Sequence, residues 1–71
     1  MLAFKLLDVG ALTEDIPCHG LFRGNVGTIV ESLAPEVFEV EFVDNDGRTY
    51  AEIALRAEQV MLLHHEPVHA A

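Results

Sequence analysis

Two glutamates, Glu39 and Glu41, stand in the alternating segment Val37–Val43. In a β-strand they would share one face, about 7 Å apart at a rise of ~3.3 Å per residue. A carboxylate pair can hydrolyse a glycosidic bond, but only within a substrate cleft. Because a chain of 71 residues leaves little room for a cleft, we interpret the pair as a solvated acidic face. If it has a function, it is a patch for a basic partner.

The segment Asp44–Gly47 resembles part of a calcium loop. If Gly47 were the glycine of an EF-hand, the first ligand would be Phe42 and the bidentate acid would be Ile53. Neither side chain can bind calcium. Asn, Asp and Gly are typical of tight turns between strands, so we predict a hairpin turn.

Three histidines, His64, His65 and His69, lie close together near the end of the sequence. His65 and His69 have the spacing of a helical metal pair, but Pro67 between them disfavours a helix. We therefore predict a solvated strand end and no metal or other cofactor.

Cys18 and His19 are adjacent, which is poor geometry for a thiolate–imidazole pair, and Ser32 is the only serine. A nucleophilic triad needs groups positioned by separate elements. We expect no catalytic residues and no enzymatic activity.

The segment Arg23–Gly27 has the glycines of a phosphate-binding loop but lacks the G-K-[ST] ending and precedes a predicted strand. It also resembles the KOW-type turn of nucleic-acid-associated small barrels. That reading stays open as an alternative, with contacts centred on Arg23, Arg48 and Arg56.

The chain carries 12 acidic and 4 basic side chains, giving a formal net charge of −8. Nucleic-acid binding depends on Lys and Arg neutralising phosphates, so this balance makes it unlikely and also disfavours an anionic membrane surface. The same field favours association with a basic protein.

Counting glycine, 40 of the 71 residues are apolar, a larger share than in an average domain. The surplus could cover a partner or a second copy of the chain. Cys18 is the only cysteine, which favours a reducing compartment. No apolar run is long enough for a membrane helix, and no signal-peptide pattern is present. We expect a full-length cytoplasmic protein.

The apolar periodicity predicts five strands, which are separated by turn-forming residues and a longer loop over 13–24. The expected strands are Leu7–Leu12 with Val9 on the buried side, Asn25–Leu33, Val37–Val43, Arg48–Leu55 and Gln59–His64. Gly27 indicates a bulge or a close backbone approach. The segment 34–36 is a predicted turn, and Ala57-Glu58 is a predicted helical turn before the last strand.

These elements predict an all-β class and a small SH3-like barrel of about five strands with a single 3-10 turn before the last strand. One domain covers residues 1–71, with frayed ends at 1–6 and 66–71. Homodimerisation through an open barrel edge is a second expectation.

The stretch from Leu7 to Leu63 resembles a bacterial family, the domain of unknown function 4926. The matching residues are Leu7-Asp8-Val9, Asp15-Ile16-Pro17, Gly20-Leu21, Arg23-Gly24-x-Val26-Gly27-Thr28-Ile29-Val30-Glu31, Val40-Glu41-Phe42, Asp44-x-Asp46-Gly47-Arg48-Thr49 and Leu55-Arg56. The resemblance implies an SH3-like barrel such as the small barrel of nitrile hydratase β subunits. It implies no activity and no catalytic residues, and it suggests a neighbouring partner, in some cases a toxin.

We therefore expect a non-catalytic protein-interaction module, antitoxin-like or accessory, that binds a protein partner through an acidic and apolar face. The candidate face comprises Glu39, Glu41, Arg23, Arg48 and Arg56. The alternatives are a KOW-like nucleic-acid- or ribosome-associated barrel and an accessory subunit resembling the nitrile hydratase β barrel, the latter by analogy of fold alone.

Overall fold

A computed structural model describes residues 4–64, which form five β-strands and two 3-10 turns. The strands are β1 (Val9–Leu12), β2 (Val26–Ala34), β3 (Val37–Val43), β4 (Thr49–Arg56) and β5 (Val60–Leu62). The turns are η1 (Pro17–His19), between β1 and β2, and η2 (Ala57–Gln59), between β4 and β5. The predicted all-β class with five strands is confirmed, and so is the 3-10 turn before the last strand.

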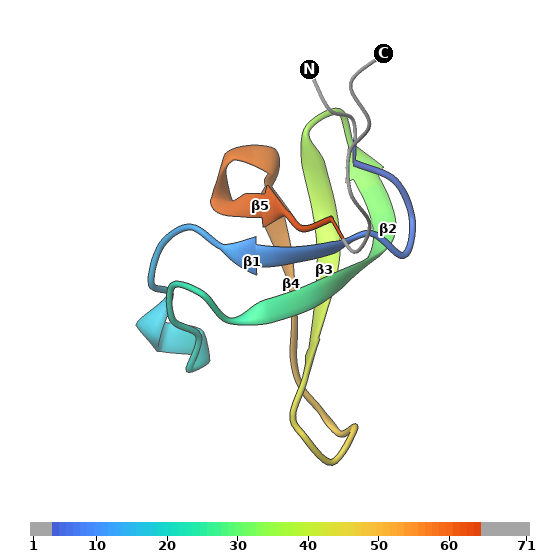
Figure 1. Cartoon of the computed structure of the whole chain (residues 1–71). Helices are drawn as coiled ribbons and strands as arrows, with labels where there is room; N and C mark the ends of the chain where they lie inside the picture. Colours follow the sequence, from blue (N-terminus) through green and yellow to red (C-terminus); the bar gives the residue numbers. More distant parts are fainter. Residues whose placement is uncertain (1–3, 65–71) are drawn as a thin grey trace.

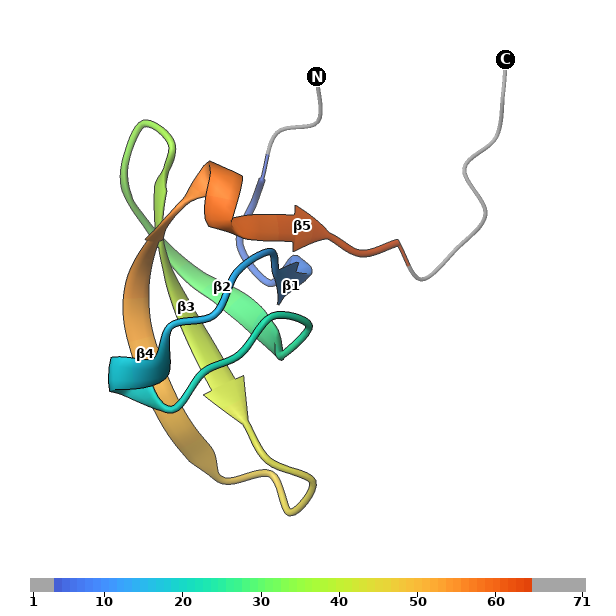
Figure 2. The ribbon, with the colours of Figure 1, turned by 90° about the vertical axis from the view of Figure 1, so that its left-hand side faces the viewer.

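All strand pairs are antiparallel, and the order across the sheet is β4-β3-β2-β1-β5. The sheet is strongly bent, so that β1 and β5 cross over the upper parts of β3 and β4 (Figures 1 and 2). It is barrel-like but not closed, because β4 and β5 stand at the two ends of the strand order.

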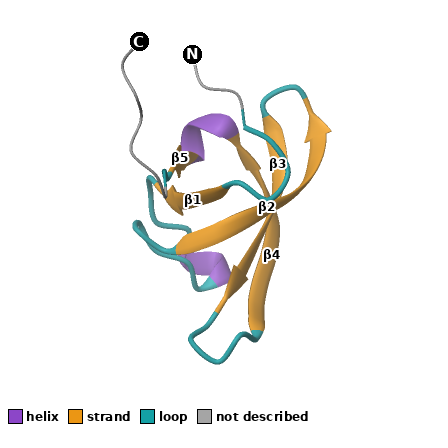
Figure 3. Cartoon of the chain, turned by 45° about the vertical axis from the view of Figure 1, so that its right-hand side comes forward, coloured by secondary structure: helices purple, strands orange, loops and turns teal. Residues whose placement is uncertain are grey.

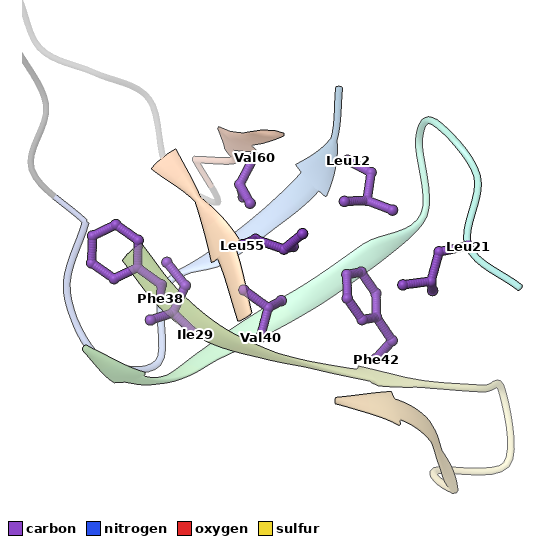
Figure 4. Close-up of a cluster of buried hydrophobic side chains, with 8 residues drawn as sticks. All are labelled: Leu12, Leu21, Ile29, Phe38, Val40, Phe42, Leu55 and Val60. Atoms are coloured by element: carbon purple, nitrogen blue, oxygen red, sulfur yellow. The ribbon is translucent and has the colours of Figure 1, made fainter. Parts of the chain in front are cut away.

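The core lies on the concave side of this sheet and is built by strict alternation in β3. Phe38, Val40 and Phe42 are buried, as predicted, while the residues between them are half-buried. Single residues of the other elements complete the cluster (Figure 4), namely Leu12, Leu21, Ile29, Leu55 and Val60. Successive side chains of a strand point to opposite faces. Every second side chain therefore enters the core, and the residues between them form the outer face of the sheet.

Gly27 makes the close backbone approach that its position in β2 suggested. A Cβ atom at Gly27 would lie 2.7 Å from Cγ1 of Val40 and 2.8 Å from the ring of Phe42. The bulges of β2 occur further along, where the β2–β3 register shifts between Ile29 and Glu31 and again between Ser32 and Ala34. The bulge alternative at Gly27 is therefore wrong, and these shifts bend the strand.

Two tight turns join the central strands (Figure 3). Pro35 and Glu36 connect β2 to β3, and Glu36 has a positive φ of 66°. The Asp44–Gly47 segment connects β3 to β4, as predicted: Oδ1 of Asp44 accepts the N–H groups of Asp46 and Arg48, and Gly47 has a φ of 80°. This second hairpin projects from the body of the molecule (Figure 1).

The N-terminal segment differs from the prediction. Leu7 has a positive φ of 70° and is exposed, so β1 begins at Val9 and not at Leu7. Val9 is only half-buried, and Leu12 supplies the core side chain. Phe4, expected in a frayed end, packs against Phe38 with ring centroids 5.2 Å apart. Aromatic burial at a small core outweighs the fraying of a chain end.

The loop between β1 and β2 also contains η1, a 3-10 turn that the sequence did not predict. Pro17 starts the turn, and Gly20, with a φ of 69°, ends it. An isolated bridge pairs Ile16 with Leu21, which brings the fully buried Leu21 under the sheet. No helix within residues 4–64 has the length and apolar character needed to cross a membrane.

Candidate interaction surface

Glu39 and Glu41 lie on the outer face of β3, opposite to the core, as predicted. Both are half-buried and not fully solvated. The strand register gives each one an acidic neighbour: Glu39 pairs with Glu31 of β2, and Glu41 pairs with Glu52 of β4. Directly opposed residues share a face with Cβ atoms about 5 Å apart. We call these four glutamates, Glu31, Glu39, Glu41 and Glu52, the acidic patch.

The acidic patch has little internal compensation. The Oγ1 hydroxyl of Thr49 donates a hydrogen bond of 2.6 Å to Oε2 of Glu41. Within residues 4–64 the one ion pair is Arg56 with Glu58, at 3.3 Å between Nε and Oε1, and both side chains are exposed. The four carboxylates therefore face solvent without a cation from the described chain, and like charges directly opposed across strands are destabilising.

An apolar row crosses the same outer face next to the acidic patch. Ala11 of β1 pairs with Met61 of β5 on one side and with Val26 of β2 on the other. The β2–β3 ladder ends at the pair of Gly27 with Phe42, and Val26 and Val43 are the next residues of the two strands beyond this pair. Val26 is 48% exposed, Val43 45% and Met61 57%. We call Met61, Ala11, Val26 and Val43 the apolar row; it adjoins Thr28 and Glu41, which pair with each other.

The three arginines of the predicted face are not brought together. Arg48 lies next to the β3–β4 turn, and Arg56 ends β4 at its opposite end. Eight residues of strand at about 3.3 Å each separate them by roughly 25 Å. Arg23 lies in the β1–β2 loop, where its N–H donates to Oδ1 of Asp15. The register places Arg56 opposite Val37 on the outer face, whereas Arg23 and Arg48 lie outside the paired strands.

The remaining candidates form no cluster in the described part of the chain. Cys18 and His19 are both exposed in η1, and His64 is exposed after β5. His65 and His69 lie outside the described residues. Over residues 4–64 no group of three His, Cys, Asp or Glu side chains is placed to hold a metal ion.

The sequence did not identify six residues of this surface: Glu31, Glu52, Ala11, Val26, Val43 and Met61. Their types were visible, but their placement depends on which residues of different strands face each other. The two-residue turn after Ala34 fixes the β2–β3 register at one end, and the later shifts in β2 change it. Glu52 lies in β4, where the β3–β4 register also shifts between Phe42 and Val43, so the length of neither turn was a sufficient signal.

The comparisons with known proteins identify a family. A family model described as Domain of unknown function (DUF4926) matches residues 6–62, which is more than half of the chain. Neither the curated proteins nor the solved structures gave a match. The chain therefore belongs to the family of this domain of unknown function.

Proposed function

We propose that the protein is a non-catalytic interaction module of the cytoplasm, which binds a basic protein partner through its outer sheet face. The observation that carries the proposal is the acidic patch, in which two like-charged pairs oppose each other across the strands. An antitoxin-like or accessory subunit is one form of this function.

The fold gains nothing from opposing four carboxylates, since such pairs cost stability. Cationic side chains of a partner would convert this cost into favourable contacts. A net charge of −8 also speeds the encounter with a basic surface.

The apolar row supplies the second component of an interface. Interfaces combine a desolvated apolar centre with a polar rim, and the row of Met61, Ala11, Val26 and Val43 adjoins the patch. A partner covering both would bury Met61 and the two valines while its cations meet the glutamates.

The nucleic-acid alternative receives no support from the geometry, because the three arginines lie in separate regions. The comparison with nitrile hydratase β subunits remains an analogy of fold, and fold alone does not specify function. We retain the protein-binding function as the single proposal.

The test compares two charge-matched variants of the affinity-tagged chain in an extract of the source cells. Glu39→Gln with Glu41→Gln neutralises the patch, while Glu36→Gln with Asp46→Asn neutralises two exposed turn residues. A stoichiometric partner that is retained by the wild type and the turn variant but lost from the patch variant supports the proposal. The complex should also weaken as salt rises, since exposed charge contacts are screened.

Equal retention of the partner by both variants would show that the acidic patch is not the binding surface. A partner composed of nucleic acid, identified by nuclease sensitivity, would also overturn the proposal.

A further inference from the structure

The outer edge of β4 is an unpaired strand edge. β4 stands at the end of the strand order, and within the described residues it pairs with β3 alone. Figure 2 shows it along the margin of the sheet. Exposed edges are templates for a further strand.

The ladder shows which backbone groups of β4 face this edge. The N–H of Ala57 donates to the carbonyl of Glu36, so these two residues form a hydrogen-bonded pair. Hydrogen-bonded and non-hydrogen-bonded pairs alternate in an antiparallel ladder. Leu55 and Ile53 therefore bond to β3, whereas Glu52 and Ala54 direct their N–H and C=O groups away from it.

The edge ends at a defined residue. The backbone groups of Arg56, like those of Glu52 and Ala54, point away from β3. The N–H of Arg56, however, donates to Oε1 of Gln59 at 2.9 Å. This side-chain cap leaves Glu52 and Ala54 as the central groups open to a new strand.

Proteins protect exposed strands by short length, by charged side chains and Pro, and by bulges. β4 carries Glu52 and Arg56 and has a register shift against β3 near the turn, between Phe42 and Val43, but its pairing from Ala51 to Arg56 is regular. The other terminal strand, β5, has only three residues, whereas β4 has eight and contains neither Lys nor Pro.

Side chains on the two faces of β4 define what an added strand must carry. On the inner side, Ala51 and Ile53 are half-buried and pack against the core, so apolar residues of a new strand would extend that core. On the outer side, Glu52 belongs to the acidic patch, so basic residues would face it.

We infer that β4 accepts an extended segment of the basic partner in which basic and apolar residues alternate, added as a sixth antiparallel strand. This inference rests on the proposed function and specifies how the partner binds. A second copy of this chain fits the edge less well, because it would double a net charge of −8 and bring a second Glu52 into the same region.

The probe is a short capped peptide in which lysine and valine alternate. Its lysines would lie opposite Glu52 and Ala54, so the lysine N–H groups would bond to β4 and the valine N–H groups would point away. Binding should slow amide hydrogen exchange at Glu52 and Ala54. Exchange at Ile53, which already bonds to β3, should change less.

Two matched pairs isolate the backbone contact. N-methylation of the lysines should weaken binding by at least about tenfold, while N-methylation of the valines should leave it nearly unchanged. Ala54→Pro, which removes an edge N–H at a position where proline is tolerated, should have the same effect, while Ala54→Val should not. Slow exchange at Val40, which pairs with Ile53, verifies that each variant is folded.

Two outcomes overturn the inference outright: the peptide causes no protection at Glu52 and Ala54, or both N-methylated forms bind equally. Concentration-dependent protection of these amides without peptide would assign the edge to a second copy. Binding that responds to Glu39→Gln with Glu41→Gln but not to Ala54→Pro would leave the proposed function intact and exclude strand addition. The reverse pattern would leave strand addition intact and exclude the acidic patch.

Discussion

At the scale of single residues, Gly27 shows how closely β2 packs onto β3. Its missing side chain is replaced by Val40 and Phe42, whose atoms occupy the place of a Cβ. Both are among the most deeply buried residues. Neither of them can move without displacing others, because cores of this density transmit strain.

Gly27→Ala should therefore destabilise the protein by about 1–3 kcal/mol, the usual cost of overpacking. The free energy of unfolding, measured by urea denaturation, tests this expectation. The matched control is Thr28→Ala at the next position, on the outer face, where the loss should stay below about 1 kcal/mol. Equal effects of the two changes would contradict the packing explanation.

The acidic patch leads to the opposite expectation, a gain in stability on removal of charge. Glu31→Gln with Glu39→Gln removes the like-charge opposition between β2 and β3 and should stabilise the fold by about 0.2–1 kcal/mol. Glu36→Gln with Asp46→Asn, with the same change in net charge, should give less. A destabilised patch variant would mean that these carboxylates have partners within the chain.

At the scale of elements, alternation predicted most strands, and β3 matched in both bounds. Period-2 patterns depend on local sequence alone, which is why they can be recognised without a structure. The prediction for the N-terminal region was wrong because its structure does not follow from local alternation. Leu7 has a positive φ and lies outside the strand, and the position of Phe4 depends on its contact with Phe38, which is distant in sequence. The cross-strand pairs of the acidic patch escaped prediction because register shifts decide them: shifts in β2 set the Glu31–Glu39 pair, and a shift in the β3–β4 ladder precedes the Glu41–Glu52 pair.

The β2–β3 turn offers a test at this scale. Glu36 has a φ of 66°, in the left-handed region that costs a residue with a Cβ roughly 1–2 kcal/mol. Glycine adopts it without that cost but loses about 0.4–1 kcal/mol through a more flexible unfolded chain.

Glu36→Gly should therefore stabilise the hairpin by up to about 1.6 kcal/mol, seen as a higher denaturation midpoint with an unchanged slope. Ala34→Gly, two residues earlier at the end of β2, should instead lose about 0.5–1 kcal/mol, since extended backbone gives glycine no advantage. A loss in both variants would show that Glu36 is not strained.

At the scale of the whole molecule, charge and shape act together. The chain has a net charge of −8, and over residues 4–64 the open sheet leaves β4 without a strand on one side. Both properties reduce the stability of the isolated chain: compact like charges repel, and an unpaired edge leaves backbone groups to solvent. A basic strand on β4 would counter both at once.

The same repulsion predicts how the isolated protein responds to salt. The Debye length falls from about 30 Å at 0.01 M to about 8 Å at 0.15 M ionic strength, so repulsion that spans the molecule at low salt becomes local. In the unfolded chain the same charges lie farther apart, so added salt lowers their repulsion less than it does in the folded protein. The free energy of unfolding at neutral pH should therefore rise over this range of NaCl and then level off. The rise should be smaller for Glu31→Gln with Glu39→Gln, which removes two charges. A flat dependence would show that the acidic side chains lie too far apart to affect the fold, whereas a rise that continues linearly at high salt would indicate a general salt effect on apolar burial.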